Sequence, residues 1–244
     1  MTIIFRKIIP LITTIFVSII DIYCQDKIYI VPNQFSFQAL FIKPNGDTLS
    51  KEFIHVSPLE SEWKYDKSQK EIKYFFNPDT IGLTYFINPV NKRQKKRIKY
   101  PLVPWIVQTT TGFIENGRTV WWHPFRDNQY IYTEIAPFPE VFFDSLGVCS
   151  EWNSELHIMF GWDNFKGVVN SKYTLIDTIN DFELKNFKLK NCSRIEAIGT
   201  HSVLGKSTLT ILYDKSYGFL LLDYLFYDGT KIQFKLIDVI NKQN

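Results

Sequence analysis

Residues 111–141 read TGFIENGRTVWWHPFRDNQYIYTEIAPFPEV, and this stretch carries the densest folding signal in the chain. It contains a tight-turn dipeptide, Asn116-Gly117. Two runs rich in aromatic and β-branched residues follow, at 118–123 and 128–136, and such residues suit the pleated, half-buried surface of a strand. The motif Pro137-Phe138-Pro139 closes the stretch. The pattern predicts two strands, and it is a folding signature rather than a catalytic one.

The clearest strands lie in the C-terminal third. Residues 207–213 place Ser207, Leu209, Ile211 and Tyr213 on one face. The next run, GFLLLDYLFY at 218–227, is apolar on both faces apart from Asp223, which predicts an interior strand covered on both sides. A hairpin turn at Asp228-Gly229 then leads into an alternating strand, 230–239.

Alternation also marks the N-terminal half. Residues 28–56 read as strand, turn and strand, with Phe35, Phe37, Ala39 and Phe41 on one face. A second hairpin is expected from 72–76 and 83–87, and the polar stretch 58–70 leaves room for a helical turn. The fold class that we predict is mainly β: a strongly curved antiparallel sheet, half-barrel or sandwich-like, with few or short helices.

The first two dozen residues have the features of a secretory signal. A basic pair, Arg6-Lys7, precedes the mostly apolar run 8–20, which is short for a membrane span. We therefore expect a signal peptide at 1–24 and an exported protein, periplasmic or associated with the outer membrane. A retained anchor is one alternative, and acylation of Cys24 in a lipoprotein is another, although the bulky Tyr23 fits a lipobox poorly.

Composition limits the remaining possibilities. The 244 residues include 21 Phe, 13 Tyr and 6 Trp, and the net charge is +3, too small to indicate a nucleic-acid partner. Six basic residues lie between Lys92 and Lys99; they fit a solvated loop better than an anionic membrane site. A boundary between an N-terminal β unit, 25–100, and a C-terminal antiparallel β domain, 101–244, is expected near 92–104.

Two cysteines remain after export, Cys149 and Cys192. They either form a disulfide in an oxidising compartment or act as small buried hydrophobes. Neither lies in a CxxC motif, so the sequence predicts no metal site of that kind, and it predicts no cofactor.

The candidate binding residues cluster in the stretch quoted first. His123 lies near Arg126, Asp127 and Glu134, and a histidine beside carboxylates can act as a general base or a ligand. A structural role, with the ring packed on a tryptophan and Arg126 paired to a carboxylate, is the other interpretation. No catalytic residue is assigned. The ligand-binding candidates are Trp121, Trp122, His123, Arg126 and Tyr132.

Residues 191–240, NCSRIEAIGTHSVLGKSTLTILYDKSYGFLLLDYLFYDGTKIQFKLIDVI, resemble the ends of exported Gram-negative proteins and, more loosely, the open half-barrel of LolA-like lipoprotein carriers. The segments TGFIEN, VWWHPFR and IAPFPEV are similar to uncharacterised exported or lipoprotein-like chains, and the resemblance spans roughly 104–240. It implies a fold and no functional residue.

Three functions follow as hypotheses. The first is an exported, non-enzymatic protein whose concave aromatic face binds an apolar small molecule, a lipid or a lipidated partner, with membrane association. The second is a structural or interaction protein of the cell envelope. The third is a hydrolase that uses His123. The first two differ in whether an apolar cavity stays open between the sheet and its cover.

Overall fold

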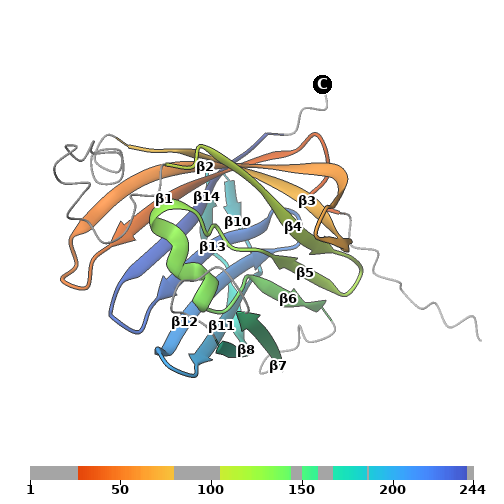
Figure 1. The fold of residues 1–244 in the computed structure, drawn as a ribbon. Coiled ribbons are helices and arrows are strands. Elements are labelled where there is room, and N and C mark those ends of the chain that lie inside the picture. The colour runs from red at the N-terminus through yellow and green to blue at the C-terminus, as the bar shows by residue number, and fades with distance from the viewer. Residues whose placement is uncertain (1–26, 80–104, 144–149, 159–166, 186, 241–244) are drawn as a thin grey trace, which may run out of the picture.

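One antiparallel sheet of twelve strands organises the computed structural model, which describes residues 27–79, 105–143, 150–158, 167–185 and 187–240 (Figure 1). The strand order is β6-β5-β4-β3-β2-β1-β14-β13-β12-β11-β8-β7, and β9 pairs with β10 in a separate hairpin. The strands are β1 Gln34–Ile42, β2 Thr48–Trp63, β3 Asp66–Asn77, β4 Gln108–Glu115, β5 Thr119–Trp122, β6 Glu140–Phe142, β7 Glu151–Ile158, β8 Gly167–Ile179, β9 Phe182–Leu184, β10 Phe187–Leu189, β11 Cys192–His201, β12 Gly205–Asp214, β13 Gly218–Leu225 and β14 Lys231–Ile240.

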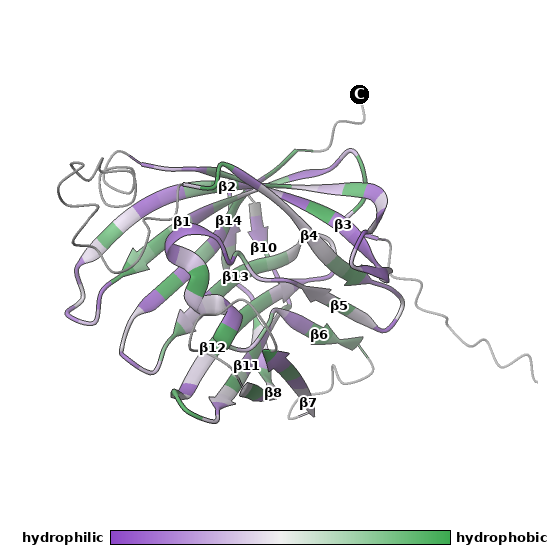
Figure 2. Cartoon of the chain, viewed as in Figure 1, coloured by the Kyte–Doolittle hydropathy of each residue, from purple (hydrophilic) through white to green (hydrophobic). Residues whose placement is uncertain are grey.

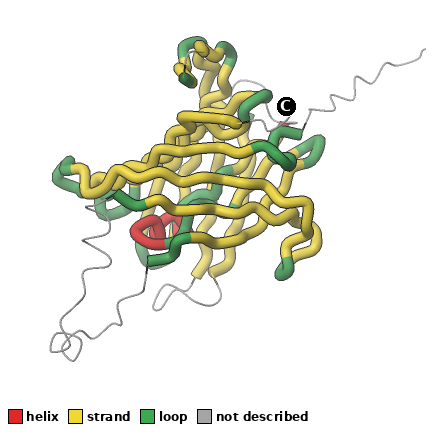
Figure 3. Tube along the Cα trace, turned by 90° about the horizontal axis from the view of Figure 1, so that it is seen from above, coloured by secondary structure: helices red, strands yellow, loops and turns green. Residues whose placement is uncertain are grey.

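The first and last strands meet in the middle of this sheet. On β1, Phe37 lies opposite Ile54 of β2 on one side and Leu236 of β14 on the other. From there the order runs outward in both directions to β6 and β7, which follow each other in sequence and form the two edges. The sheet curves until these edges approach, so it is nearly closed into a barrel (Figures 1 and 3). The predicted mainly β, strongly curved antiparallel fold is confirmed.

Every second side chain along a strand points into the curve of the sheet. Figure 2 shows the matching alternation of hydrophobic and hydrophilic residues along the strands. The predicted inward row of β1, from Phe35 to Phe41, is buried, as is the row of β12 from Ser207 to Tyr213. The interior is mainly aromatic. Its largest fully buried side chains are Trp122, Tyr74, Tyr130, Tyr173, Tyr213, Tyr224, Phe35, Phe37, Phe76, Phe125, Phe219 and Phe234.

The predicted interior strand at 218–227 is β13, which lies between β12 and β14. Its inner face is fully buried, as at Leu222. The β9–β10 hairpin lies on the outer side of the neighbouring strand β14: Phe182 is buried, and the Lys235 amine of β14 lies 5.4 Å from the centre of its ring. On β13 itself, the outward Leu225 is 41% exposed. Coverage of β13 on both sides, as predicted, therefore does not extend to Leu225.

The prediction of a strand at 128–136 is wrong, because residues Asn128–Ile135 form a 3-10 helix, η1. The side chains of the consecutive residues Gln129 and Tyr130 both reach the same carboxylate, that of Glu52, whereas a strand would send neighbours to opposite faces. Figure 1 shows η1 inside the curve of the sheet, between β1 and β12. The helix thus occupies space inside the curve of the sheet, whereas a strand would have added to the sheet itself.

The helical turn suggested within 58–70 is also wrong, since β2 runs on to Trp63 and β3 starts at Asp66. Register shifts between Pro58 and Trp63 bend this hairpin, and bulges of this kind re-aim side chains. The expected strand at 83–87 lies outside the described residues, as does the domain boundary at 92–104. The strands on either side of that boundary, β3 and β4, pair with each other.

The segment before β1 seals one end of the barrel. The Glu115 carboxylate accepts hydrogen bonds from the backbone N–H groups of Ile28 and Tyr29, at 2.7 and 2.9 Å. The Tyr29 hydroxyl accepts one from the Phe219 N–H at 2.8 Å. A Cβ on Gly218 would lie 1.9 Å from that hydroxyl, so this glycine makes room for the plug. The predicted signal peptide precedes this segment and lies outside the described residues.

Candidate functional site

Three of the five candidate binding residues, Trp121, Trp122 and His123, are divided between the two faces of the sheet. Trp122 points into the barrel and is fully buried, and its ring packs against Tyr29 and Phe219 at centroid distances of 4.5 and 5.1 Å. Trp121 and His123 lie together on the other face, 4.7 Å apart. Trp122 is therefore a core residue and is not part of the same surface.

His123 lies in a slot of aromatic rings. Its ring centre is 4.9 Å from that of Trp63 and 5.7 Å from that of Phe138, in addition to Trp121. Trp63 comes from the bent end of β2, sixty positions away in sequence. Close approach is possible because Gly112 lies beneath Trp63, where a Cβ would come within 2.7 Å of the indole. The sequence patterns gave no sign of Trp63, since its burial depends on this tertiary contact.

The imidazole of His123 is neutral. Arg126 lies 3.2 Å from its Nδ1, and because a guanidinium only donates, Nδ1 accepts and the proton is on Nε2. Burial and, to a lesser extent, the Arg126 charge lower the pKa of His123 to about 3, with the charge of Asp66 acting in the opposite direction. Nε2 is buried and has no partner among the described residues. A general base needs an accessible lone pair, which this ring lacks.

Arg126 anchors the segment after β5 through contacts with η1 and β4. Its Nη1 donates to the Glu134 carboxylate in a partly buried ion pair, and its Nη2 donates to the Thr111 hydroxyl at 3.3 Å. Burial raises the pKa of Glu134, against the effect of the Arg126 charge, and burial raises the pKa of Asp127. These contacts match the structural interpretation of the sequence, in which the arginine bridges to a neighbouring carboxylate.

A second buried polar cluster, which sequence reasoning missed, holds η1 in place. Glu52 is 1% exposed, and its carboxylate accepts hydrogen bonds from Gln129 Nε2 at 2.6 Å and from the Tyr130 hydroxyl at 2.7 Å. Burial raises the pKa of Glu52, and both hydrogen bonds oppose that effect. One signal was available: Glu52 is two positions before Ile54 and four before Val56, so it shares the inward face of β2 with them.

Tyr132 is the fifth candidate. Its ring lies 5.7 Å from that of Phe226, where η1 meets the β13–β14 turn. It is neither beside Trp121 nor within the polar clusters. The structure thus brings His123, Arg126 and Trp121 together and separates them from Trp122 and Tyr132.

Of the two cysteines expected to form a disulfide or to be buried separately, the structure describes Cys192. Cys192 begins β11 and is buried, and burial raises the pKa of its thiol to about 11. Cys149 lies outside the described residues, so the bridge between them stays a prediction. Across the described part of the chain, no group of three or more His, Cys, Asp or Glu side chains is placed to hold a metal ion. Nor does any helix described here have the length and apolarity needed to cross a membrane.

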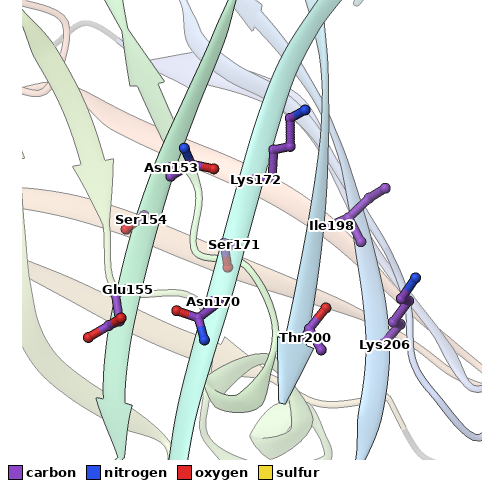
Figure 4. A pocket seen from close by; sticks show the side chains of 9 residues that line it. All are labelled: Asn153, Ser154, Glu155, Asn170, Ser171, Lys172, Ile198, Thr200 and Lys206. Atoms are coloured by element: carbon purple, nitrogen blue, oxygen red, sulfur yellow. The ribbon is translucent and has the colours of Figure 1, made fainter. Parts of the chain in front are cut away.

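An open groove of about 440 Å³ lies on the outer side of β7, β8, β11 and β12 (Figure 4). Lys172, one of its cations, is paired with Glu151 at 2.8 Å, and Ile198 is 47% exposed. Its lining is mostly short polar side chains on a rigid sheet face, and nothing in the sequence pattern singled them out. The lining residues are Asn153, Ser154, Glu155, Asn170, Ser171, Lys172, Ile198, Thr200 and Lys206.

No protein-family model matches the chain, and no curated protein matches it. Two solved structures are similar in fold. A Bacteroides fragilis NCTC 9343 protein, provisionally described as exported and with a YmcC-like fold, has 7% identity and a TM-score of 0.44, covering 86% of this chain and 95% of its own. A Parabacteroides distasonis ATCC 8503 protein, provisionally described as a lipoprotein, has 11% identity and a TM-score of 0.43, covering 85% and 94%. At such distances no activity, ligand or partner passes to this chain.

Proposed function

We propose that the protein is an exported, non-enzymatic component of the cell envelope that acts as a structural or interaction protein, with its aromatic residues serving as the core of the barrel. The observation that carries this proposal is the filled concavity. Phe125, in the loop after β5, packs against Phe37, Tyr74 and Phe234 at centroid distances of 5.4, 4.8 and 4.7 Å. The chain's own side chains occupy the space that an apolar ligand would need.

Burial of this aromatic set is strongly stabilising. Aromatic side chains bury large areas, and their edge-to-face contacts add to that effect. A carrier would instead keep a lined cavity available, with few polar groups inside. Here the cover also carries buried polar anchors, because Glu52 holds Tyr130 and Gln129. Displacing η1 would leave these groups unpaired, at a cost of about 1–3 kcal/mol for each.

An apolar-ligand protein is the second candidate, and one feature favours it. At the end of the barrel where η1 lies, Val203, Ile131 and Tyr227 are 79%, 46% and 39% exposed. These apolar side chains surround the site at which a ligand would enter if η1 moved. Envelope partners with apolar surfaces would meet the same residues.

Binding of fluorobenzene, followed by ¹⁹F NMR, distinguishes the two candidates. The wild-type protein should show no saturable binding, because the core has no space for the ring. Phe125→Ala is the positive control, since truncation of a buried aromatic opens a dry cavity of the kind that binds benzene. Saturable binding of one equivalent by the wild-type protein would contradict the proposal and favour the apolar-ligand protein.

Export needs its own test. N-terminal sequencing of the protein from the producing cell should begin after residue 24, in line with the basic pair Arg6-Lys7 and the short apolar run that follows. A sequence that begins at Met1 or Thr2 would refute export by a cleaved signal.

A further inference from the structure

The two edges of the sheet meet at a seam, which we define as the contact of residues 137–142 with β7, β8 and β11. Phe138 supplies a backbone carbonyl that accepts a hydrogen bond from the Tyr173 hydroxyl at 2.9 Å. Pro137 packs on Gly199, where a Cβ would come within 2.8 Å of the proline ring. Among the described residues β6 pairs only with β5, and β7 only with β8. Side chains, rather than a backbone ladder, therefore hold the seam.

Glu140 lies at the centre of this seam. It is opposite Trp121 in the β5–β6 register, and its carboxyl group is hydrogen-bonded to Ser154 of β7. Its second oxygen, Oε2, is buried without a partner among the described residues. Burial raises the pKa of Glu140 to about 7, and the Ser154 hydrogen bond opposes that shift. A buried carboxylate with so little compensation is costly, whereas the neutral acid fits the site.

The groups that face Glu140 do not offset a negative charge. Tyr173, from β8, interacts electrostatically with it, and burial raises the pKa of that phenol well above its ordinary value. The phenol therefore stays neutral through the range in which Glu140 titrates. Nearby charges on β7 are engaged elsewhere: Glu155 pairs with His157 at 2.6 Å, and Glu151 pairs with Lys172.

We propose that the seam is a pH-responsive opening of the barrel, closed while Glu140 is protonated and loosened when it ionises. An ionised Glu140 needs water, and water reaches Oε2 only if β6 and β7 separate. Opening would also free the unpaired backbone groups of both edges. Because β6 has only three residues and no backbone ladder joins β6 to β7 among the described residues, this is the part of the barrel that can open without breaking the main ladder.

Hydrogen exchange of the purified protein, read by mass spectrometry at pH 5.5, 7.0 and 8.5 and corrected for intrinsic rates, tests the proposal. Protection of amides in 137–142 and 151–158 should fall by about tenfold per pH unit between pH 5.5 and 7.0 and then level off by pH 8.5, because the open form ionises at the ordinary pKa and the closed form only at about 7. In Glu140→Gln it should stay constant, and amides of β13 should not change in either protein. Unchanged protection of the seam in the wild-type protein, or an equal fall in Glu140→Gln, would overturn the proposal.

Ser154→Ala supplies a second variant that does not depend on how Glu140→Gln folds. Removing the hydrogen bond that favours the ionised carboxyl should move the midpoint of opening to higher pH. A midpoint that stays at its wild-type value would contradict the role of Glu140.

Discussion

Truncation of Trp122 is the perturbation that should reveal most about the filled interior. Its side chain is fully buried and contacts the rings of Tyr29, Phe37, Phe125 and Phe219, all between 4.5 and 6.2 Å. Trp→Ala changes in cores cost about 3–5 kcal/mol. The indole N–H has no partner among the described residues, so its removal returns about 1 kcal/mol. We expect Trp122→Ala to lower the free energy of unfolding by about 2–4 kcal/mol.

Urea unfolding followed by far-UV circular dichroism measures this loss. Trp122→Phe should cost no more than about 2 kcal/mol, because it keeps an aromatic ring and removes the unpaired N–H. Tyr65→Ala is a matched surface control: its side chain is 73% exposed, and such changes usually stay within about 0.5 kcal/mol. A loss under 1 kcal/mol for Trp122→Ala would refute the reasoning, since the indole would then not be part of a packed core.

Three further predictions concern stability. In urea melts, the free energy of unfolding of Glu140→Gln should match that of the wild-type protein at pH 5 and exceed it at pH 8.5 by about 1–3 kcal/mol. The reason is that the pKa of Glu140 is raised to about 7 in the folded protein, so the wild-type protein loses stability as pH rises from the ordinary value through 7, whereas the glutamine does not titrate. Equal curves at both pH values would refute this. Leu222→Asp should be severely destabilising in thermal melts, because it buries an unpaired charge, whereas Leu225→Asp, on the open part of the outer face, should change stability by about 0.5 kcal/mol or less; equal tolerance would show that the faces of β13 are misassigned. Glu52→Ala should cost about 1–3 kcal/mol, measured by urea unfolding, because the buried Tyr130 hydroxyl loses its acceptor and Gln129 Nε2 keeps only Ser50; a neutral effect would mean that η1 is not anchored there.

Strands whose stability is local could be predicted from the sequence. The hairpin of β1 and β2 follows from alternation around the turn Pro44–Asp47, and β13 follows from an apolar run on both faces. In each case the residues that decide the structure lie within a few positions of one another. The contact of the β9–β10 hairpin with β14 could not be predicted, because it depends on tertiary packing of Phe182 near Lys235.

The helix η1 shows why local propensity failed. Tyr130, Ile131, Tyr132 and Thr133 are aromatic or β-branched residues that favour strands. The helical form is stabilised by Glu52, which lies 77 positions before Gln129, and tertiary context of this kind routinely outweighs propensity.

The candidate site was predicted in part for the same reason. Arg126 and Glu134 are close in sequence and do pair, and His123 packs on Trp121 as the structural interpretation expected. The alternation of β5 could have separated Trp121 from Trp122, because neighbours on a strand face opposite ways. Trp63 comes from β2, and Ser154, the partner of Glu140, comes from β7 at the opposite edge of the sheet from β6. No spacing in the sequence indicates either contact.

Native mass spectrometry of the protein purified from its producing cell tests the central claim most directly. If aromatic side chains fill the barrel, the folded protein should have the mass of its polypeptide, with any covalent acyl group retained on denaturation and no lipid or other apolar molecule held noncovalently. A stoichiometric apolar adduct that survives in the folded protein and is lost on unfolding would contradict the claim.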